Sequence, residues 1–205
     1  MTRPSEASQP PVRTTVLRVP LTQIVDLINR GQLTPAGAPG GPGWAPRQHA
    51  DLWHSVESGW PIGLLTVWTP WLDRPRRCYL LDGHRRAAAI TQASSRDGVP
   101  LLRNLSSSGP DYTSPNSPHD DPYLPTTAML RTRDFLPATR HLPPDLLRHA
   151  ERIAHAVMTA PVDLLTIEGG SPHQVDTLCR RLLGPRVALA TLTALYDTDR
   201  PTATR

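Results

Sequence analysis

The chain has 205 residues, of which 38% are hydrophobic, and its formal net charge is +4 at pH 7. This length suits one ordinary domain and does not require two. The charge permits an anionic partner but falls short of the dense basic stripe that indicates nucleic-acid binding by itself, and the two distant cysteines make no metal-ligand pair.

The two ends of the chain are predicted to be tails. Residues 1–14 are mostly polar and Pro-rich, which is typical of disorder, and a second tail is expected over 197–205. Residues 1–11 contain no apolar segment of a secretion signal, and no run in the chain approaches membrane-spanning length. Cys78 and Cys179 lie in apolar surroundings, which is typical of buried thiols in a reducing compartment. The sequence therefore predicts a cytoplasmic protein without a membrane partner.

Regular elements are predicted from the spacing of apolar residues and from helix end signals. In chain order, we expect helices over 21–28 and 48–58, strands over 64–68 and 78–81, a helix that ends near 94, a helix over 145–159, a strand over 162–167 and a last helix that begins after 171. The first two strands predict a hairpin. Ser171 and Gln174 are spaced as a capping box, which is typical of a helix start.

Two stretches have the composition of irregular structure. Residues 34–46 read TPAGAPGGPGWAP, which predicts a Pro- and Gly-rich loop with Trp44 as its aromatic anchor. Residues 104–125 are rich in Ser, Pro, Asn and Asp, and we interpret them as a flexible surface insertion.

The stretch 79–90, YLLDGHRRAAAI, places two arginines where a helix is expected to begin. Gly83 permits a tight turn between the strand and the helix. Such a junction leaves unpaired backbone N–H groups at the helix start, which attract anions, and Arg85 and Arg86 suit forked contacts with phosphate. The motif therefore predicts a phosphate site, and the alternative is a helix whose first turn carries solvent-facing arginines.

A resemblance to a known family rests on three segments. LWHSVESGWPIGLLTVW followed by YLLDGHRRAAAI resembles the N-terminal domain of the GmrSD-type restriction proteins, within the ParB/sulfiredoxin-like superfamily. In that pattern a Gly-aromatic-Pro-Ile-Gly turn, here 59–63, precedes two strands, and Asp-Gly-Gln-Gln-Arg opens a helix. Asp82, Gly83 and Arg86 match this last motif. APVDLLTIEGGSPHQVDTLCRRLLGPRVAL is similar to the closing strand and helix of the family, so the resemblance spans about 16–195.

The sequence departs from the family pattern at several positions. His84 and Arg85 replace the two Gln of the helix-opening motif, and GAPGGPG precedes Trp44 where the family has a Gln-Arg pair. In the closing helix Arg181 matches, but Leu183 stands where the family has Asn. Sulfiredoxin activity needs a reactive Cys in the motif loop and is not expected here. The Gly-Glu-Arg-Arg segment with which ParB proteins grip nucleotide phosphates is similar to Gly83-His84-Arg85-Arg86.

Each candidate site residue has a functional and a structural interpretation. The phosphate-binding candidates implied by the resemblance are Gly83, Arg85, Arg86 and, from the later helix, Arg181. Arg86 contacts phosphate or pairs with a nearby carboxylate. Asp82 is a catalytic candidate that holds a metal ion on the nucleotide or orients Arg86, and the alternative is a turn or helix cap. His84 is a second catalytic candidate as a general base, and the commoner alternative is a surface histidine.

The aromatic and histidine residues give weaker signals. Trp44, Trp60 and Trp68 are candidates for stacking on a base, but tryptophan more often packs in a core or loop. Trp60 lies in the family turn, and we expect it to be structural. The histidines form no pair backed by a carboxylate, so no metal site within the protein is predicted.

We therefore expect a single α+β domain of the ParB/sulfiredoxin-like type over 15–196, with a small mixed sheet flanked by helices. The resemblance implies a bacterial DNA-related or defence protein that binds a nucleoside triphosphate, with Mg²⁺ as an accompanying ion, and it leaves hydrolysis open. DNA and a partner protein that supplies another activity are further candidate partners, and nuclease activity of this chain alone is not expected. The alternative is a non-catalytic adaptor that binds nucleic acid or a partner protein, which the missing family positions favour.

Overall fold

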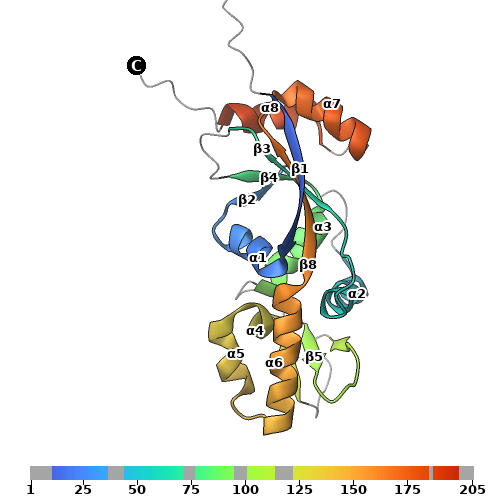
Figure 1. The fold of residues 1–205 in the computed structure, drawn as a ribbon, viewed down its shortest axis with the longest axis vertical. Helices are drawn as coiled ribbons and strands as arrows, with labels where there is room; N and C mark the ends of the chain where they lie inside the picture. The colour runs from blue at the N-terminus through green and yellow to red at the C-terminus, as the bar shows by residue number, and fades with distance from the viewer. Residues whose placement is uncertain are drawn as a thin grey trace, which may run out of the picture.

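A mixed five-stranded sheet forms the centre of the protein (Figure 1). The computed structural model describes residues 11–36, 44–71, 77–94, 101–113, 122–184 and 187–198. The strands of the sheet, in spatial order, are β1 (Arg13–Pro20), β8 (Pro161–Glu168), β3 (Leu65–Thr69), β4 (Cys78–Asp82) and β2 (Leu33–Pro35). β1 pairs with β8, and β3 with β4, in antiparallel fashion, whereas β8–β3 and β4–β2 are parallel.

Helices cover this sheet and extend the molecule beyond it. They are α1 (Leu21–Asn29), α2 (Pro46–Glu57), α3 (His84–Ser94), α4 (Thr126–Leu130), α5 (Thr132–Thr139), α6 (Pro144–Thr159), α7 (Pro172–Leu182) and α8 (Leu189–Thr198). A small antiparallel sheet has the order β6-β5-β7, with β6 at Tyr112–Thr113, β5 at Leu102–Asn104 and β7 at Tyr123–Pro125. Figure 1 shows α6 extending away from the main sheet below β8, with α5 on one side of it and the small sheet on the other.

The mixed α+β class and the predicted elements are confirmed. The helix expected over 145–159 is α6, and the two strands expected as a hairpin are β3 and β4, which are antiparallel. The capping box opens α7, since the Ser171 N–H donates to Gln174 Oε1 at 2.8 Å and the Gln174 N–H donates to Ser171 Oγ at 3.4 Å. The sequence analysis missed β1, β2, the small sheet, α4, α5 and α8.

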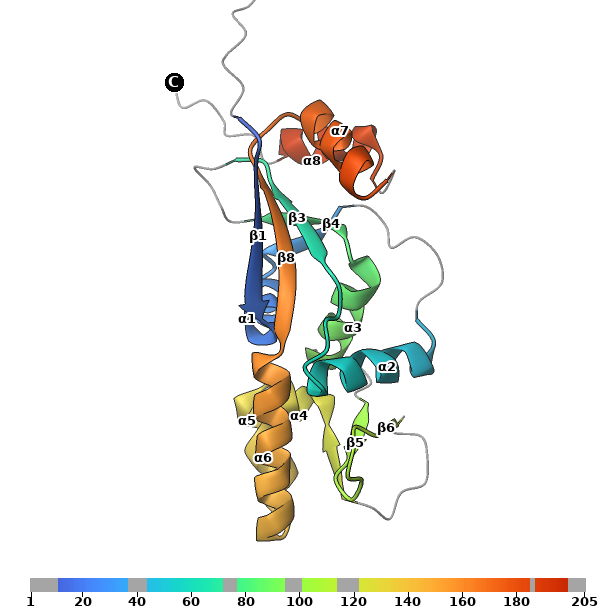
Figure 2. The same cartoon turned by 45° about the vertical axis from the view of Figure 1, so that its right-hand side comes forward.

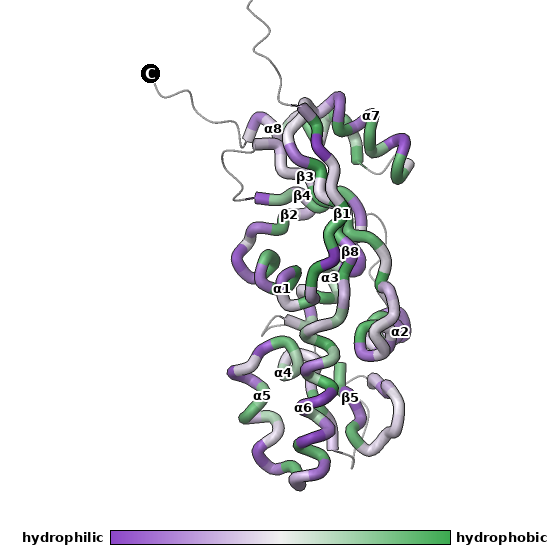
Figure 3. Tube along the Cα trace, in the orientation of Figure 1, coloured by the Kyte–Doolittle hydropathy of each residue, from purple (hydrophilic) through white to green (hydrophobic). Residues whose placement is uncertain are grey.

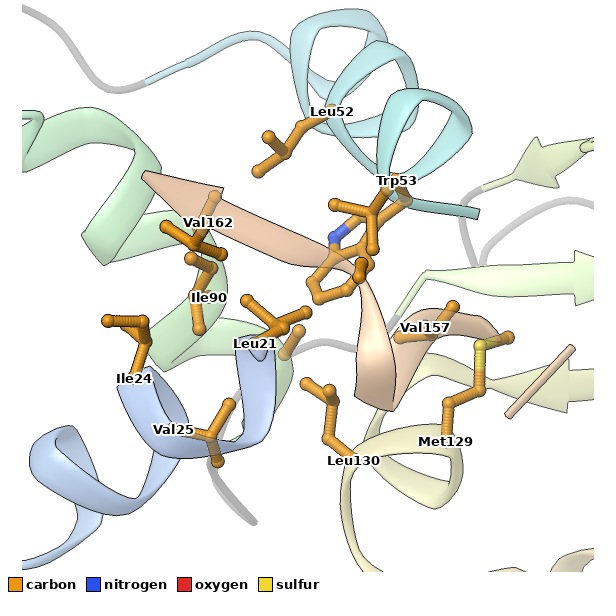
Figure 4. Close-up of a cluster of buried hydrophobic side chains, with 14 of the residues drawn as sticks. Leu21, Ile24, Val25, Leu52, Trp53, Ile90, Met129, Leu130, Val157 and Val162 are labelled. Carbon is orange, nitrogen blue, oxygen red and sulfur yellow. The ribbon is translucent and has the colours of Figure 1, made fainter. Parts of the chain in front are cut away.

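The central strands β3 and β4 are buried on both faces, whereas the edge strand β1 is mostly exposed. Because side chains alternate along a strand, neighbouring residues of β3 and β4 belong to different clusters. Leu80 of β4 and Val67 of β3 belong to the larger hydrophobic cluster, together with residues of α1, α2, α3, α4 and α6. Figure 4 shows part of this cluster, in which Trp53 of α2 faces side chains from several elements. Their chain neighbours, Tyr79 and Trp68, belong to a second cluster with residues of α7 and α8. The apolar runs of β3 and β4 therefore reflect burial on two sides.

The longest described helix, α6, leads into β8 and lies beside α4 and α5, away from the main sheet (Figure 2). Its buried residues Ala150, Ile153, Ala154 and Val157 follow helical spacing and form one face. Figure 3 shows hydrophilic and hydrophobic positions alternating along α6. α6 thus packs against α2 and α4 with one face and presents charged side chains to solvent with the other.

The start of the domain differs from the predicted tail over 1–14, because β1 already begins at Arg13. Of its eight residues only Val19 is buried, so the strand has no apolar alternation that a sequence search would detect. Its order comes from backbone pairing with β8 along its full length. α8 likewise runs to Thr198, into the predicted tail over 197–205, while residues 1–10 and 199–205 lie outside the described residues.

The predicted flexible insertion over 104–125 is ordered in its described parts. β6 and β7 pair with β5 on either side. Buried Arg103 donates from Nε and Nη2 to the carboxylate oxygens of Glu57 at 2.8 and 2.9 Å, and the Tyr112 hydroxyl donates to Glu57 Oε2 at 2.7 Å. Because these partners lie far apart in sequence, composition alone gave no sign of them. Residues 114–121 lie outside the described residues.

The predicted loop over 34–46 is shorter than expected at both ends. β2 extends to Pro35, and α2 begins at Pro46. Residues 37–43 of the predicted loop lie outside the described residues.

Both cysteines are free thiols, as expected, but they differ in burial. Cys179 is buried, and its burial together with the neighbouring Asp176 carboxylate raises the pKa of the thiol to about 11. Cys78 is only half-buried and accepts a hydrogen bond from Thr69 Oγ1 at 3.5 Å. No helix in the described ranges combines the length and the apolar character that crossing a bilayer requires.

Candidate functional site

The motif of residues 82–86 forms the turn between β4 and α3. Gly83 has a φ of +91°, which L-residues rarely adopt, and a Cβ there would lie 2.3 Å from Leu65 Cδ2. Glycine is therefore required both by the backbone and by the packing of β3. The Ala87 N–H donates to the Gly83 carbonyl at 3.0 Å, so α3 begins directly at the turn.

A register shift in the hairpin lies beside this turn. Thr66 of β3 is paired with Asp82, whereas Val67 is paired with Leu80. One extra residue of β4, Leu81, lies opposite this step, which is the pattern of a β-bulge. Bulges reorient the side chains that follow them and are frequent beside functional sites, so the shift supports a specialised role for the end of β4.

An open pocket of about 510 Å³ lies at the junction and is lined by Trp44, Leu81 and residues 82–86. The structure thus brings together Asp82, His84 and the proposed phosphate-binding residues of the turn. Arg181 is exposed in the last turn of α7 and is not among the described residues that line the pocket. The first turn of an α-helix has backbone N–H groups without a partner within the helix, and such groups favour anions, so the start of α3 can contribute to anion binding at this pocket.

Arg86 is turned toward the protein and connects two turns of the chain. Its Nη1 donates to the Ile62 carbonyl at 2.9 Å, and its Nη2 lies 4.0 Å from Asp82 Oδ2. Burial lowers the pKa of the guanidinium, and the Asp82 carboxylate opposes this shift. Arg86 therefore lies beside a carboxylate, as its structural interpretation expects, and contact with phosphate stays a prediction.

Gly63 makes this position of Arg86 possible. It has a φ of +84°, and a Cβ on it would lie 2.4 Å from Arg86 Nη1. The side chain of Arg86 is 20% exposed, so it fills the space between the 59–63 turn and the β4–α3 turn while still lining the pocket. The sequence analysis missed Gly63 as a site-forming residue, although the Gly-aromatic-Pro-Ile-Gly pattern contained the signal.

His84 differs from the surface histidine that was the commoner expectation. Its side chain is half-buried, and Nε2 is buried without a hydrogen-bond partner among the described residues. Burial lowers the pKa of the imidazole, while the Asp82 carboxylate and a hydrogen bond to the Leu80 backbone raise it. Because the net shift is downward from 6.5, His84 is mainly neutral at pH 7 and adds little positive charge to the pocket.

Arg85 and Asp82 complete the charged lining. Arg85 is exposed at the start of α3, so its guanidinium lies at the solvent side of the pocket. The Asp82 side chain is 26% exposed and supplies the carboxylate in the described lining. Mg²⁺ on a nucleotide is commonly held by one or two protein carboxylates together with the phosphates, so Asp82 fits such an ion. Among the described residues, no cluster of three or more His, Cys, Asp or Glu side chains could hold a metal ion.

The three candidate stacking tryptophans lie in different environments. Trp68 is fully buried, and its Nε1 donates to the Gly169 carbonyl at 2.9 Å, so it belongs to the core. Trp60 was expected to be structural, but its side chain is 59% exposed and tilted against His54. Backbone hydrogen bonds from Gly59 and Trp60 to the end of α2, and the hydrogen bond from Arg86 to the Ile62 carbonyl, hold the 59–63 turn. Trp44 lines the pocket, which makes it the candidate placed for ligand contact.

Comparison with protein-family models and with curated proteins finds no match to this chain. The assignment of the pocket therefore depends on its own residues and geometry.

Proposed function

We propose that the pocket at the β4–α3 junction binds the phosphate chain of a nucleoside triphosphate. The observation that carries this proposal is the meeting of Arg85, Arg86 and the first turn of α3 in one open pocket. Helix N-termini attract anions through their unpaired N–H groups, and arginine makes forked contacts with phosphate oxygens. These features favour a multiply charged phosphate chain over a neutral ligand.

The size of the pocket supports a nucleotide. Its volume of about 510 Å³ lies within the range of roughly 300–1,000 Å³ that is usual for small-molecule sites. The resemblance to the GmrSD-type proteins and to the phosphate-gripping segment of ParB proteins supports the same ligand class. It also supports a role in a bacterial DNA-related or defence system, which is an analogy and not a property of the pocket.

Hydrolysis by this site is proposed to be slow. The neutral His84 and the Asp82 carboxylate are the candidate catalytic groups, and Mg²⁺ would be held by Asp82 together with the bound phosphates. Leu183, at the end of α7, replaces the polar Asn of the family pattern. The described pocket lining does not include Leu183 and contains no Asn or Gln side chain that could position a water molecule in its place, so we expect binding without ordinary turnover.

A non-catalytic adaptor is the second candidate. Arg86 already contacts Ile62 and Asp82, so this motif residue has a structural function even where no ligand binds. Val16 and Leu17 of the edge strand β1 and the indole of Trp60 are exposed hydrophobic groups of the kind that partner proteins contact. The salt dependence of affinity would distinguish duplex DNA from a single nucleotide as the ligand. Affinity for duplex DNA falls by roughly 0.9 log units per log unit of salt for each phosphate neutralised.

A thermal-unfolding assay with ATP and Mg²⁺ tests the nucleotide proposal. Binding to the folded state should stabilise it by about 2.7 kcal/mol at a ligand concentration of 100 times the dissociation constant. Arg85→Ala should remove most of this stabilisation, whereas Arg133→Ala, which changes an exposed arginine of α5, should retain it. The stabilisation of Arg181→Ala by ATP and Mg²⁺ shows whether Arg181 of α7 contributes to nucleotide binding. Equal stabilisation of wild type and Arg85→Ala would contradict the site assignment.

A further inference from the structure

The pocket at the β4–α3 junction combines charged groups with an indole. Residues 82–86 supply a carboxylate, an imidazole and two guanidinium groups, and Trp44 supplies a large planar apolar surface. The pocket volume of about 510 Å³ exceeds what a phosphate group alone requires. A ligand that uses the whole pocket therefore carries an anionic part and a flat aromatic part.

The indole of Trp44 is held in place without a parallel stacking partner in the described residues. His49, in the first turns of α2, lies against it with ring centroids 5.7 Å apart and an interplanar angle of 87°. Trp44 also packs against the larger hydrophobic cluster while remaining partly exposed. A perpendicular contact of this kind fixes the orientation of the ring but leaves room for a planar ligand to stack on it.

From this arrangement we infer that Trp44 is the stacking platform for the base of a nucleotide whose phosphates lie at Arg85 and the first turn of α3. The inference depends on the proposed function and adds the recognition of the base to it. Every base has a π-face, so the platform selects bases by stacking area and not by hydrogen-bond pattern. It therefore takes purine nucleotides in preference to pyrimidine nucleotides and does not separate ATP from GTP.

Calorimetric titration of the full chain with inorganic triphosphate, ATP and CTP tests the platform. Stacking on an aromatic side chain strengthens binding on the order of 10-fold to 100-fold. Wild type should therefore bind ATP more tightly than inorganic triphosphate by about that factor, with CTP between them. Trp44→Leu keeps apolar bulk but has no π-face, so it should bind ATP and inorganic triphosphate about equally. Trp44→Phe should retain part of the preference, and Trp60→Ala should retain all of it.

The outcomes separate the platform from the phosphate site. Equal affinity of wild type for ATP and inorganic triphosphate would overturn the platform and leave the phosphate site intact. An equal loss of affinity for ATP and for inorganic triphosphate in Trp44→Leu would also overturn the platform, because Trp44 would then only support the fold of the pocket. If neither ligand binds wild type, the proposed function fails, and the platform fails with it. Should Trp44→Leu not fold, Trp44→Phe carries the test, and an unchanged or abolished ATP preference there contradicts a graded contribution of stacking area.

Discussion

The guanidinium of Arg86 lies against the backbone of Gly63, where a Cβ atom would approach Arg86 Nη1 to 2.4 Å. From this position Arg86 Nη1 donates to the carbonyl of Ile62 at 2.9 Å. The turn between α2 and β3 is thereby tied to the start of α3, across a sequence separation of 24 residues. A side chain at position 63 would therefore require the guanidinium of Arg86 to move from this position.

Gly63→Ala should destabilise the protein more than Gly59→Ala. Both glycines have positive φ, +84° and +69°, so both substitutions carry a backbone cost of roughly 1–2 kcal/mol. A Cβ at Gly59 would contact nothing within 4 Å, whereas the one at Gly63 would collide with Arg86. We expect an additional loss of about 1–3 kcal/mol for Gly63→Ala, measured by urea unfolding.

A double-mutant cycle provides the control for this collision. In the background of Arg86→Ala the additional cost of Gly63→Ala should disappear, because the clashing guanidinium is gone. Strictly additive effects of the two substitutions would show that the contact between Gly63 and Arg86 is not what makes the glycine necessary.

Arg85 and Arg86 should separate binding from stability. Arg86→Ala leaves the Ile62 carbonyl without its donor and should reduce the free energy of unfolding by about 1–3 kcal/mol. Arg85 is exposed, so Arg85→Ala should change stability by no more than about 0.5 kcal/mol while weakening nucleotide binding. Urea unfolding and nucleotide titration of the two variants check this difference. Equal destabilisation by both would contradict the distinct positions of the two side chains.

Glu57→Gln should be among the most damaging conservative substitutions. The Arg103 side chain is 1% exposed and that of Glu57 11%, so the change leaves a buried guanidinium without its counter-charge. Breaking a buried pair in this way costs about 3–5 kcal/mol. The expected result is a large fall in the urea midpoint of unfolding. Hydrogen exchange should show faster exchange of the backbone amides of the small sheet.

Two other variants calibrate this result. Tyr112→Phe removes one hydrogen bond to Glu57 but leaves the charge pair, and should cost about 0.5–1.5 kcal/mol. Asp163→Asn changes the solvent-exposed pair between β1 and β8 and should have a small effect. A Glu57→Gln variant as stable as Asp163→Asn would rule out the proposed anchoring of 101–113 by the buried pair.

The stability of the fold should depend on His84 between neutral and mildly acidic pH. Burial lowers the pKa of His84 in the folded protein below its ordinary value of 6.5. The unfolded chain then binds the proton more readily, so this stabilisation is complete above pH 6.5 and is lost as the pH falls below it. The free energy of unfolding should decrease from pH 7 to about pH 5.5 in wild type, and less steeply in His84→Gln.

Part of this pH dependence should remain in the variant. Burial also lowers the pKa of His49, and burial together with Arg103 and Arg152 lowers that of His149. An identical slope in wild type and His84→Gln would mean that these two histidines account for the whole effect. A steeper slope in the variant would contradict the downward shift of the His84 pKa.

Sequence patterns predicted the buried elements of this fold well and the exposed ones poorly. α6 has an apolar face of helical period, and β4 is an apolar run that ends at Asp-Gly, so both were found. β1 has a single buried residue and is ordered by its ladder with β8. Its formation depends on a strand some 145 residues away, for which local spacing carries no information.

The candidate site was predicted in its position but not in its internal arrangement. The strand–Gly–helix pattern correctly indicated a turn that gathers 82–86 at one pocket. The inward direction of Arg86 depends on Gly63 and Ile62, which belong to another turn, and the buried Nε2 of His84 is likewise a feature of the folded chain. Such properties follow from tertiary contacts, which residue type and spacing do not determine.

The most direct test of the account is the map of backbone amide chemical-shift changes in ¹⁵N-labelled protein as ATP and Mg²⁺ are added. Saturable changes should be largest at the amides of 83–86, and the indole N–H of Trp44 should change at the same ligand concentration. Arg85→Ala should need a higher ATP concentration for the same changes. Saturable changes centred on another surface, such as the exposed face of α6, or no saturable change at 83–86, would contradict the proposed phosphate site.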